Sequence, residues 1–326
     1  MATASPTRAE SAPLDSKPVW IVLATIVLLA SSAARAEIEV RWLGVAGFSF
    51  TAGDDTLLHD PFFTRPSAWD TLASWYRADA SVIDPLLAAD GPAPELARAR
   101  GILIGHSHYD HLGDAPYLAQ RTGASIQGSG TTARIAQGYG VPSERTPIVN
   151  PGDVFDVGPF AVRVVESRHA QVILGRVPLQ GTVEEVPETP IHALSFKLGD
   201  ARLYLVEHRL SGLRILTTSS ANRHAPALDA LRAEGVTVDL LLAAIQGRDA
   251  DYARDLVAAV RPRIVVPHHF DSFTTALASE AADAAGDPED LAAFEAEIQA
   301  AAEALGLATE VRRLSLFETL TLEPAR

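Results

Sequence analysis

The sequence contains no cysteine among its 326 residues. That absence excludes disulfide bonds, thiolate metal sites, cysteine nucleophiles and a lipid anchor on cysteine. Any metal ion bound by this chain must therefore be held mainly by histidine and carboxylate side chains.

Basic residues are scarce relative to acidic ones. The chain has 27 Lys and Arg against 41 Asp and Glu, which gives a formal net charge of -14. Binding to nucleic acid depends on clustered Lys and Arg that displace counterions from phosphates, so nucleic acid is not an expected partner. The surplus negative charge also fits a soluble surface better than one that binds anionic membranes.

Long hydrophobic runs are also lacking. The run "VWIVLATIVLLA" at residues 19–30 is shorter than the ~20 residues needed to span a bilayer. Arg8 and Lys17 precede it, and small residues at Ala34 and Ala36 follow, which is the layout of a secretory signal. We expect residues 1–36 to be a signal peptide cleaved after Ala36, so that the protein is periplasmic or secreted. The alternative is an uncleaved membrane anchor at residues 19–30, the only membrane contact expected.

Short apolar runs alternate with helical patterns along the rest of the chain, and 47% of the residues are hydrophobic. The runs "EIEVRWLG", "GFSFTAG" and "DTLLHD" predict three consecutive antiparallel strands. A hairpin turning at Gly199 and Asp200 is predicted in "IHALSFKLGDARLYLVEH". Helices are predicted at "DAPYLAQRTG", "TTARIAQGYG" and "ADYARDLVAAVRP", and over residues 291–305 with an apolar stripe of Leu291, Phe294, Ile298 and Leu305. Residues 64–98 and 178–190 are predicted to be irregular and are candidates for lids over a cleft.

Histidines cluster where apolar strands end. Four strand patterns, "ILIG", "VRVVESR", "RLYLV" and "RIVVP", each lead directly into a histidine-bearing segment. These segments hold seven of the ten histidines: His106, His108, His111, His169, His208, His268 and His269. A single such histidine is usually structural. Because ligand sites of sheet-based α/β folds gather beyond strand ends, the joint pattern indicates one metal site.

The loop "GHSHYDHLGD" holds four potential ligands within six residues, His106, His108, Asp110 and His111. Such a loop cannot readily turn all four toward one tetrahedral centre, but it can aim the first two at one ion and the last two at a neighbour. His169 would complete the first set and His269 the second, since a catalytic zinc takes about three protein ligands and a water. We expect Zn2+, as one or two ions, with Mn2+ or iron as alternatives. A metal-bound hydroxide would then serve as nucleophile.

Taken together, these motifs resemble the metallo-β-lactamase-fold hydrolase superfamily. Within it, the chain is similar to the branch of ascorbate-phosphate lactonase-like and N-acylphosphatidylethanolamine phospholipase-like proteins. The matching features run in order through residues 38–271: "VRWLGVAGFSF", "LLHDPFF", the H-x-H-x-D-H loop, "SRHA", "FKLGDARLYL" and "VVPHHF". The resemblance implies an α/β fold, a four-layer αββα sandwich of two mixed β-sheets flanked by helices, over residues 37–326.

The resemblance also bears on individual residues. It favours His269 over His268 as a ligand. It favours Asp60 as an acceptor that orients a ligand histidine, although an Asp before a proline is equally common as a plain turn residue. Asp271 is a further candidate for such an orienting role.

Two departures from the family pattern stand out. Members usually carry Gly-Asp after the strand that matches "LYLV", and that Asp bridges the two metals, whereas this chain has Glu207 and His208. Either Glu207 bridges through a one-residue bulge, or His208 takes the position and the ions are held less tightly, as in a mononuclear site or one with a softer ion. The second departure is Val45, where relatives commonly have histidine.

We therefore expect a metal-dependent hydrolase that attacks an ester, lactone or phosphodiester of a small-molecule or lipid-like substrate. The metal would stabilise the oxyanion, and Asp110 could also hand a proton to the leaving group. The alternative, favoured by Glu207 and His208, is a noncatalytic or degenerate metal-binding envelope protein of the same fold. His59, His192 and His224 are expected to be structural or surface residues, and the sequence leaves the oligomeric state open.

Overall fold

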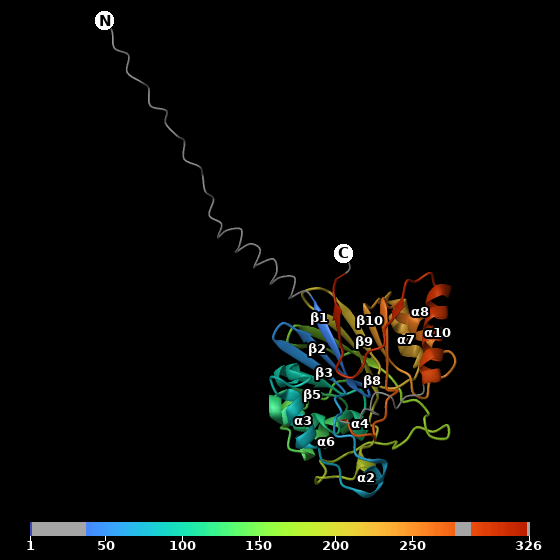
Figure 1. Cartoon of the computed structure of the whole chain (residues 1–326). Coiled ribbons are helices and arrows are strands. Elements are labelled where there is room, and N and C mark those ends of the chain that lie inside the picture. The colour runs from blue at the N-terminus through green and yellow to red at the C-terminus, as the bar shows by residue number, and fades with distance from the viewer. Residues whose placement is uncertain (2–36, 278–287, 325–326) are drawn as a thin grey trace.

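The computed structural model describes Met1 and residues 37–277 and 288–324 (Figure 1). The signal peptide or anchor expected at residues 1–36 lies outside the described residues apart from Met1. No helix within the described ranges combines the length and the apolar character needed to cross a bilayer.

The first sheet has six strands in the order β13-β1-β2-β3-β4-β5. Strands β1, β2 and β3 pair antiparallel, as their glycine and aspartate punctuation predicts, whereas β3, β4 and β5 run parallel. The strands are β1 (Ile38–Gly44), β2 (Gly47–Ala52), β3 (Asp55–His59), β4 (Ala99–Leu103), β5 (Ser125–Gln127) and β13 (Thr319–Leu322).

The second sheet has seven strands in the order β12-β11-β10-β9-β8-β7-β6. Strands β9 to β12 are parallel to one another, and β6 to β9 pair antiparallel. The strands are β6 (Val154–Val157), β7 (Phe160–Glu166), β8 (Arg202–His208), β9 (Arg214–Thr217), β10 (Leu240–Ala244), β11 (Ile264–His268) and β12 (Glu310–Val311).

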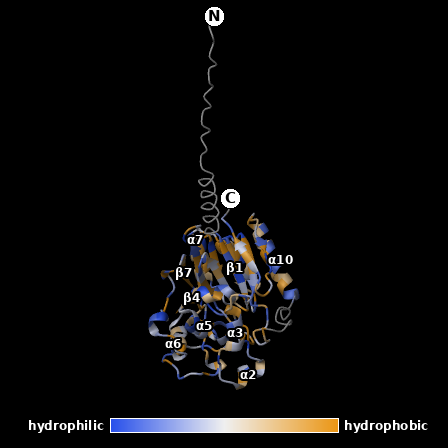
Figure 2. Ribbon diagram, turned by 60° about the vertical axis from the view of Figure 1, so that its left-hand side comes forward, coloured by the Kyte–Doolittle hydropathy of each residue, from blue (hydrophilic) through white to orange (hydrophobic). Residues whose placement is uncertain are grey.

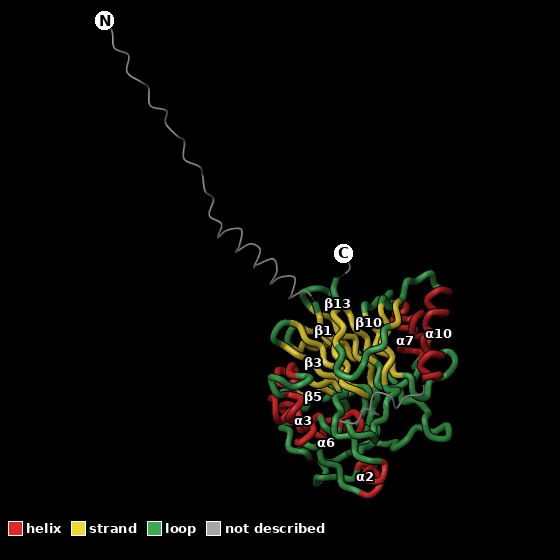
Figure 3. Tube along the Cα trace, in the orientation of Figure 1, coloured by secondary structure: helices red, strands yellow, loops and turns green. Residues whose placement is uncertain are grey.

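Helices cover the outer face of each sheet, and the sheets face each other (Figure 3). Inward side chains such as Phe50 and Tyr204 form the core between the sheets, because alternate residues of a strand point to the same face. Figure 2 shows hydrophobic residues concentrated along these strands. The helices are α2 (Ala68–Ala73), α3 (Ala80–Leu87), α4 (Tyr109–Leu112), α5 (Ala115–Thr122), α6 (Gly130–Gly138), α7 (Ala225–Ala233), α8 (Tyr252–Val260) and α10 (Pro288–Ala304), with short 3-10 turns η1 (Pro94–Arg98), η2 (Ser143–Arg145) and η3 (Ala193–Ser195). The four layers confirm the predicted αββα sandwich of two mixed sheets.

Three local predictions were wrong. The hairpin at Gly199 and Asp200 does not form, because the segment before Gly199 makes η3 and does not pair with β8. Gly199, with φ 64°, packs closely against Ser129 at the start of α6. Residues 64–98 are not irregular, because they contain α2, α3 and η1. Leu305 is 38% exposed beyond the end of α10, whereas the other three residues of its predicted stripe are buried.

Candidate metal centre

Six buried side chains converge beyond the carboxyl ends of strands from both sheets. The loop after β4 supplies His106 and His108, α4 supplies Asp110 and His111, and the segments after β7 and β11 supply His169 and His269. They form two groups, His106 with His108 and His169, and Asp110 with His111 and His269. Within each group the ligand atoms lie within 4.8 Å of one another.

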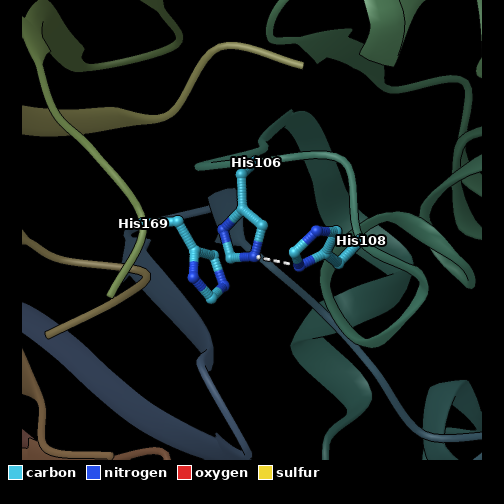
Figure 4. Close-up of side chains that lie close together, drawn as sticks. All are labelled: His106, His108 and His169. Carbon is cyan, nitrogen blue, oxygen red and sulfur yellow. Dashed lines mark hydrogen bonds between the residues drawn. The ribbon is translucent and has the colours of Figure 1, made fainter. Parts of the chain in front are cut away.

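The first group consists of three imidazoles that point toward one another (Figure 4). His106 Nε2 lies 3.1 Å from His108 Nδ1, and His169 Nδ1 lies 2.6 Å from the Ala170 carbonyl oxygen, to which it can donate. That bond leaves His169 Nε2 with a lone pair for a ligand. Burial lowers the pKa of His108 to about 3 and that of His169 to about 4, and it lowers the pKa of His106 well below its ordinary value. All three are therefore neutral at physiological pH, which is the form that binds metal.

The second group forms a nearly equilateral triangle of donor atoms. Asp110 Oδ2 lies 3.4 Å from His111 Nε2 and 3.5 Å from His269 Nε2, and the two imidazole nitrogens are 3.4 Å apart. In a tetrahedral centre with metal to nitrogen bonds of about 2.0–2.1 Å, ligand atoms lie about 3.3–3.4 Å apart. The triangle therefore fits one face of a tetrahedral site, and its nitrogen and carboxylate donors suit Zn2+, Mn2+ or iron.

The electrostatics of the second group also favour a cation. Burial raises the pKa of Asp110, but His111 and His269 lower it by a larger amount. The pKa therefore lies below its usual range, and the group is an ionised carboxylate. Burial lowers the pKa of His111, but Asp110 and Asp60 raise it above its ordinary value. The two buried carboxylates that attract a proton to His111 attract a metal ion to the same place.

Asp60 anchors the metal loop through hydrogen bonds to His111 and Gly105. Its Oδ2 accepts a hydrogen bond from His111 Nδ1 at 2.8 Å, and its Oδ1 accepts one from the Gly105 amide at 2.8 Å. Burial raises the pKa of Asp60, but His59 and His111 lower it to about 2, so it remains ionised. The bond to Nδ1 leaves His111 Nε2 free to bind metal, which is the orienting contact expected of Asp60.

Glu207 and His208 lie away from both groups, so neither of the two predicted bridging arrangements occurs. Strand β8 starts beside the metal loop, where the Arg202 amide donates to Gly105 O, and then runs away from it. Its far end is about 20 Å further on, at the usual rise of about 3.3 Å per residue. There Glu207 pairs with Arg214, and His208 hydrogen-bonds Ser211. The prediction failed because β8 is antiparallel to β9 and so ends at the opposite edge of the sheet.

Strand β9 ends at the site instead, and the residues that follow it were missed. Ser219 and Ser220 line the cavity beside the two groups, and Ser219 Oγ lies 3.3 Å from His59 Nε2. The strand end that meets the metal loop thus carries serines in place of the bridging aspartate that the resemblance implies. The run "RILTTSSA", an apolar strand that ends in hydroxyl residues, was the available signal.

Two further candidates remain, Asp271 as an orienting residue and His268 as an alternative ligand. The single N–H of Val45 donates a bifurcated hydrogen bond to both carboxylate oxygens of Asp271, and the Val45 carbonyl accepts one from the His269 amide. Asp271 therefore positions His269 through Val45. His268 belongs to neither group among the described residues and packs edge-on against Phe48.

The remaining three histidines have structural contacts, as expected of them. His59 Nδ1 bonds the Ala46 carbonyl, His192 Nε2 bonds the Leu72 carbonyl, and His224 lies 3.3 Å from Glu166.

A cavity of about 290 Å³ opens beside the two groups. Its walls are largely apolar, and no Lys or Arg is among the described residues that line it. Thr71, from the predicted lid region 64–98, and Pro178 and Leu179, from the region 178–190, are part of its wall. Its other apolar lining residues are Val172, Ile173, Leu194, Ala244 and Phe273.

Comparison with known proteins agrees with this fold. The model of the beta-lactamase superfamily domain matches residues 39–269. A UPF0173 metal-dependent hydrolase of Anaeromyxobacter dehalogenans strain 2CP-1 is 30% identical over 268 residues, which cover 80% of this chain and 82% of the relative. One from Pyrobaculum arsenaticum is 27% identical over 274 residues, which cover 82% of this chain and 94% of the relative.

Solved structures show the same fold. Igni18, a metallo hydrolase from Ignicoccus hospitalis, superposes with a TM-score of 0.56 at 16% identity and covers 88% of this chain and 99% of its own. An isothiocyanate hydrolase from Delia radicum gut bacteria superposes with a TM-score of 0.52 at 15% identity, covering 88% and 100%. The chain belongs to the metallo-β-lactamase-fold hydrolase superfamily and is a metal-dependent hydrolase.

Proposed function

We propose that this hydrolase cleaves uncharged carboxylic esters or lactones that carry an apolar group, at a centre of two metal ions. The observation that carries the proposal is the apolar cavity, without Lys or Arg in its described lining, directly beside the two groups of donors. A phosphodiester brings a negative charge that binding sites usually neutralise with such cationic side chains. An acyl chain, by contrast, gains about 0.8 kcal/mol for each buried CH2 group.

Each group of donors has a defined part in this proposal. His106, His108 and His169 hold one ion, and Asp110, His111 and His269 hold the other. When bound, such ions lower the pKa of a coordinated water to about 7 and stabilise the oxyanion formed on attack. We assign to Asp110, a carboxylate that also lines the cavity, the transfer to the leaving group of the proton that the attacking water releases. Zn2+ is the ion we propose, and Mn2+ or iron would suit the same donors.

Turnover of a graded set of substrates tests the proposal. The full chain, loaded separately with Zn2+, Mn2+ or iron, would be assayed with p-nitrophenyl esters from acetyl to octanoyl, with lactones, and with bis(p-nitrophenyl) phosphate. We expect kcat/KM for the esters to rise roughly threefold to fourfold per CH2 group until the cavity is full. Preferred turnover of the phosphodiester would refute the choice of esters and lactones as substrates. No turnover of any of these substrates with any ion would refute the proposed function as a whole.

Two histidine variants supply a matched control. His169→Ala removes a donor from the first group, and we expect it to lose bound metal and activity together. His208→Ala removes a buried histidine outside both groups and should keep both. Equal metal content, by elemental analysis, in the two variants would contradict the assignment of His169.

A further inference from the structure

Large apolar side chains gather around the mouth of the cavity. Twelve such side chains are exposed among the described residues, and half of them lie on the three segments that border the cavity, so their distribution is not even. This mouth patch consists of Trp69, Leu72, Trp75, Ile173, Leu174 and Leu194.

The mouth patch lies on the segments that supply part of the cavity wall. Helix α2 contributes Thr71 to the lining, and Trp69 and Leu72, on the same helix, are 75% and 61% exposed. Trp75 packs edge-on against His192, whose Nε2 bonds the Leu72 carbonyl, so that this end of α2 is tied to η3. Residues from η3 and from the loop after β7 complete the border, since Leu194 and Ile173 line the cavity as well.

Leu174 stands at the tip of a tight turn that does not favour leucine. Ile173 and Arg176 exchange two backbone hydrogen bonds, and the residues between them, Leu174 and Gly175, have φ of 47° and 71°. A two-residue turn with two positive φ angles favours Asn-Gly, and a leucine there is disfavoured by its Cβ. Leu174 is 97% exposed, so packing within the described chain does not compensate for this cost. Contact of Leu174 with an apolar partner outside the chain would compensate for it.

We infer that the mouth patch docks the enzyme on a zwitterionic or uncharged lipid surface, from which the apolar ester enters the cavity. The inference rests on the proposed function for the nature of the substrate. Tryptophan favours the boundary between lipid and water because its ring is apolar and its N–H is polar. The net charge of -14 opposes binding to an anionic membrane. An uncharged lipid surface is therefore the partner that matches both the patch and the charge.

Quenching of tryptophan emission by brominated phosphatidylcholine vesicles tests this docking. The full chain would carry Trp20→Phe, which leaves the buried Trp42 and the two exposed tryptophans of the patch, Trp69 and Trp75. Helix α2 lies at the opposite end of the molecule from the start of β1, so an insertion of the segment before β1 would not itself bring the patch to lipid (Figure 1). We expect the emission to shift to shorter wavelength and to be quenched, equally with and without bound metal.

A double variant in the same background, Leu72→Gln with Leu174→Asn, keeps both reporters and removes two apolar side chains. We expect its partition onto the vesicles to weaken at least about tenfold, because burial of one leucine is worth about that factor. The matched control is Leu210→Asn, which changes a 64% exposed leucine outside the patch and should bind as the parent does. Leu174→Asn alone gives the turn its preferred Asn-Gly pair, so this variant should fold at least as stably as the parent.

Three results would overturn the docking proposal. They are no quenching by the brominated vesicles, equal partition of the double variant and the control, and a lipid-independent blue-shifted emission with a dimeric mass, which would show a second copy on the patch. Quenching without any ester turnover would instead refute only the proposed function. Ester turnover without quenching would leave the proposed function standing and refute the docking.

Discussion

Replacing Asp60 by asparagine tests how the metal loop is organised. One carboxylate oxygen of Asp60 accepts from the Gly105 amide and the other from His111 Nδ1, each at 2.8 Å. Asparagine has only one acceptor oxygen. If that oxygen keeps the Gly105 bond, the amide NH2 faces His111 Nδ1, so the imidazole proton must move to Nε2, the atom that belongs to the second group of donors.

The opposite amide orientation is no better. It keeps the bond from His111 but leaves the buried Gly105 N–H facing another donor, which costs about 1–3 kcal/mol. Loss of a partner that orients a ligand histidine typically lowers metal affinity 10–100-fold, or about 1.4–2.8 kcal/mol. We expect this loss at the site of Asp110, His111 and His269 only. The first group is spared because His169 is oriented by the Ala170 carbonyl.

Calorimetric titration of the metal-free protein with Zn2+ in a competing chelator would resolve the two sites. In Asp60→Asn the binding step assigned to the second group should weaken by the stated factor, and the other step should keep its dissociation constant. The control is Glu95→Gln, another buried carboxylate, which bonds Arg41 and Ser49 and should lower stability without changing either step. If Asp60→Asn left both Zn2+ dissociation constants unchanged, or weakened both equally, the proposal that Asp60 fixes the tautomer of His111 would be refuted.

Four further predictions concern the site and the chain end. Ser219→Asp places a carboxylate just after β9 beside Asp60, so we expect the metal-free variant to melt at a lower temperature than the parent. Added Zn2+ should raise the Tm of the variant more than that of the parent. Equal Zn2+-induced shifts of Tm would count against a metal-facing position for residue 219. Gly105→Ala should lower the free energy of unfolding by roughly 1–3 kcal/mol, because its Cβ would overlap Ser219 Oγ, and Ser219→Gly in the same chain should recover most of it in urea titrations. The folded-state pKa values of His106, His108 and His169 lie below the ordinary 6.5. The unfolded chain therefore binds more protons than the folded one as the pH falls from about 6.5 to about 4, and the metal-free protein should lose stability over that window despite the opposite contribution of His111. A urea midpoint that stays constant across the window would contradict this expectation. If the protein is exported as we propose, mass spectrometry of the mature chain should find Glu37 at its N-terminus, whereas an intact Met1 would favour the anchor.

Local sequence was sufficient for many of the strands, most helices and the grouping of the donors. The spacing of His106, His108, Asp110 and His111 limits how a short loop can direct its side chains, so the division into two pairs follows from the chain itself. The fold class was implied by the resemblance that the order of the motifs carries, and the alternation of apolar strands and helices agreed with it. None of these depends on which strands become neighbours.

The tertiary structure alone decided which strand ends meet at the site. The patterns of β8 and β9 both end in polar residues, and only the sheet pairing shows that β8 runs away from the metal loop while β9 runs toward it. Ser219 therefore reaches the site and His208 does not. Likewise, Thr71 and Ile173 are about a hundred residues apart in sequence, and only the packing of α2 and the loop after β7 around one cavity brings both into its lining. Strand direction and long-range packing depend on contacts between distant residues, which no local pattern records.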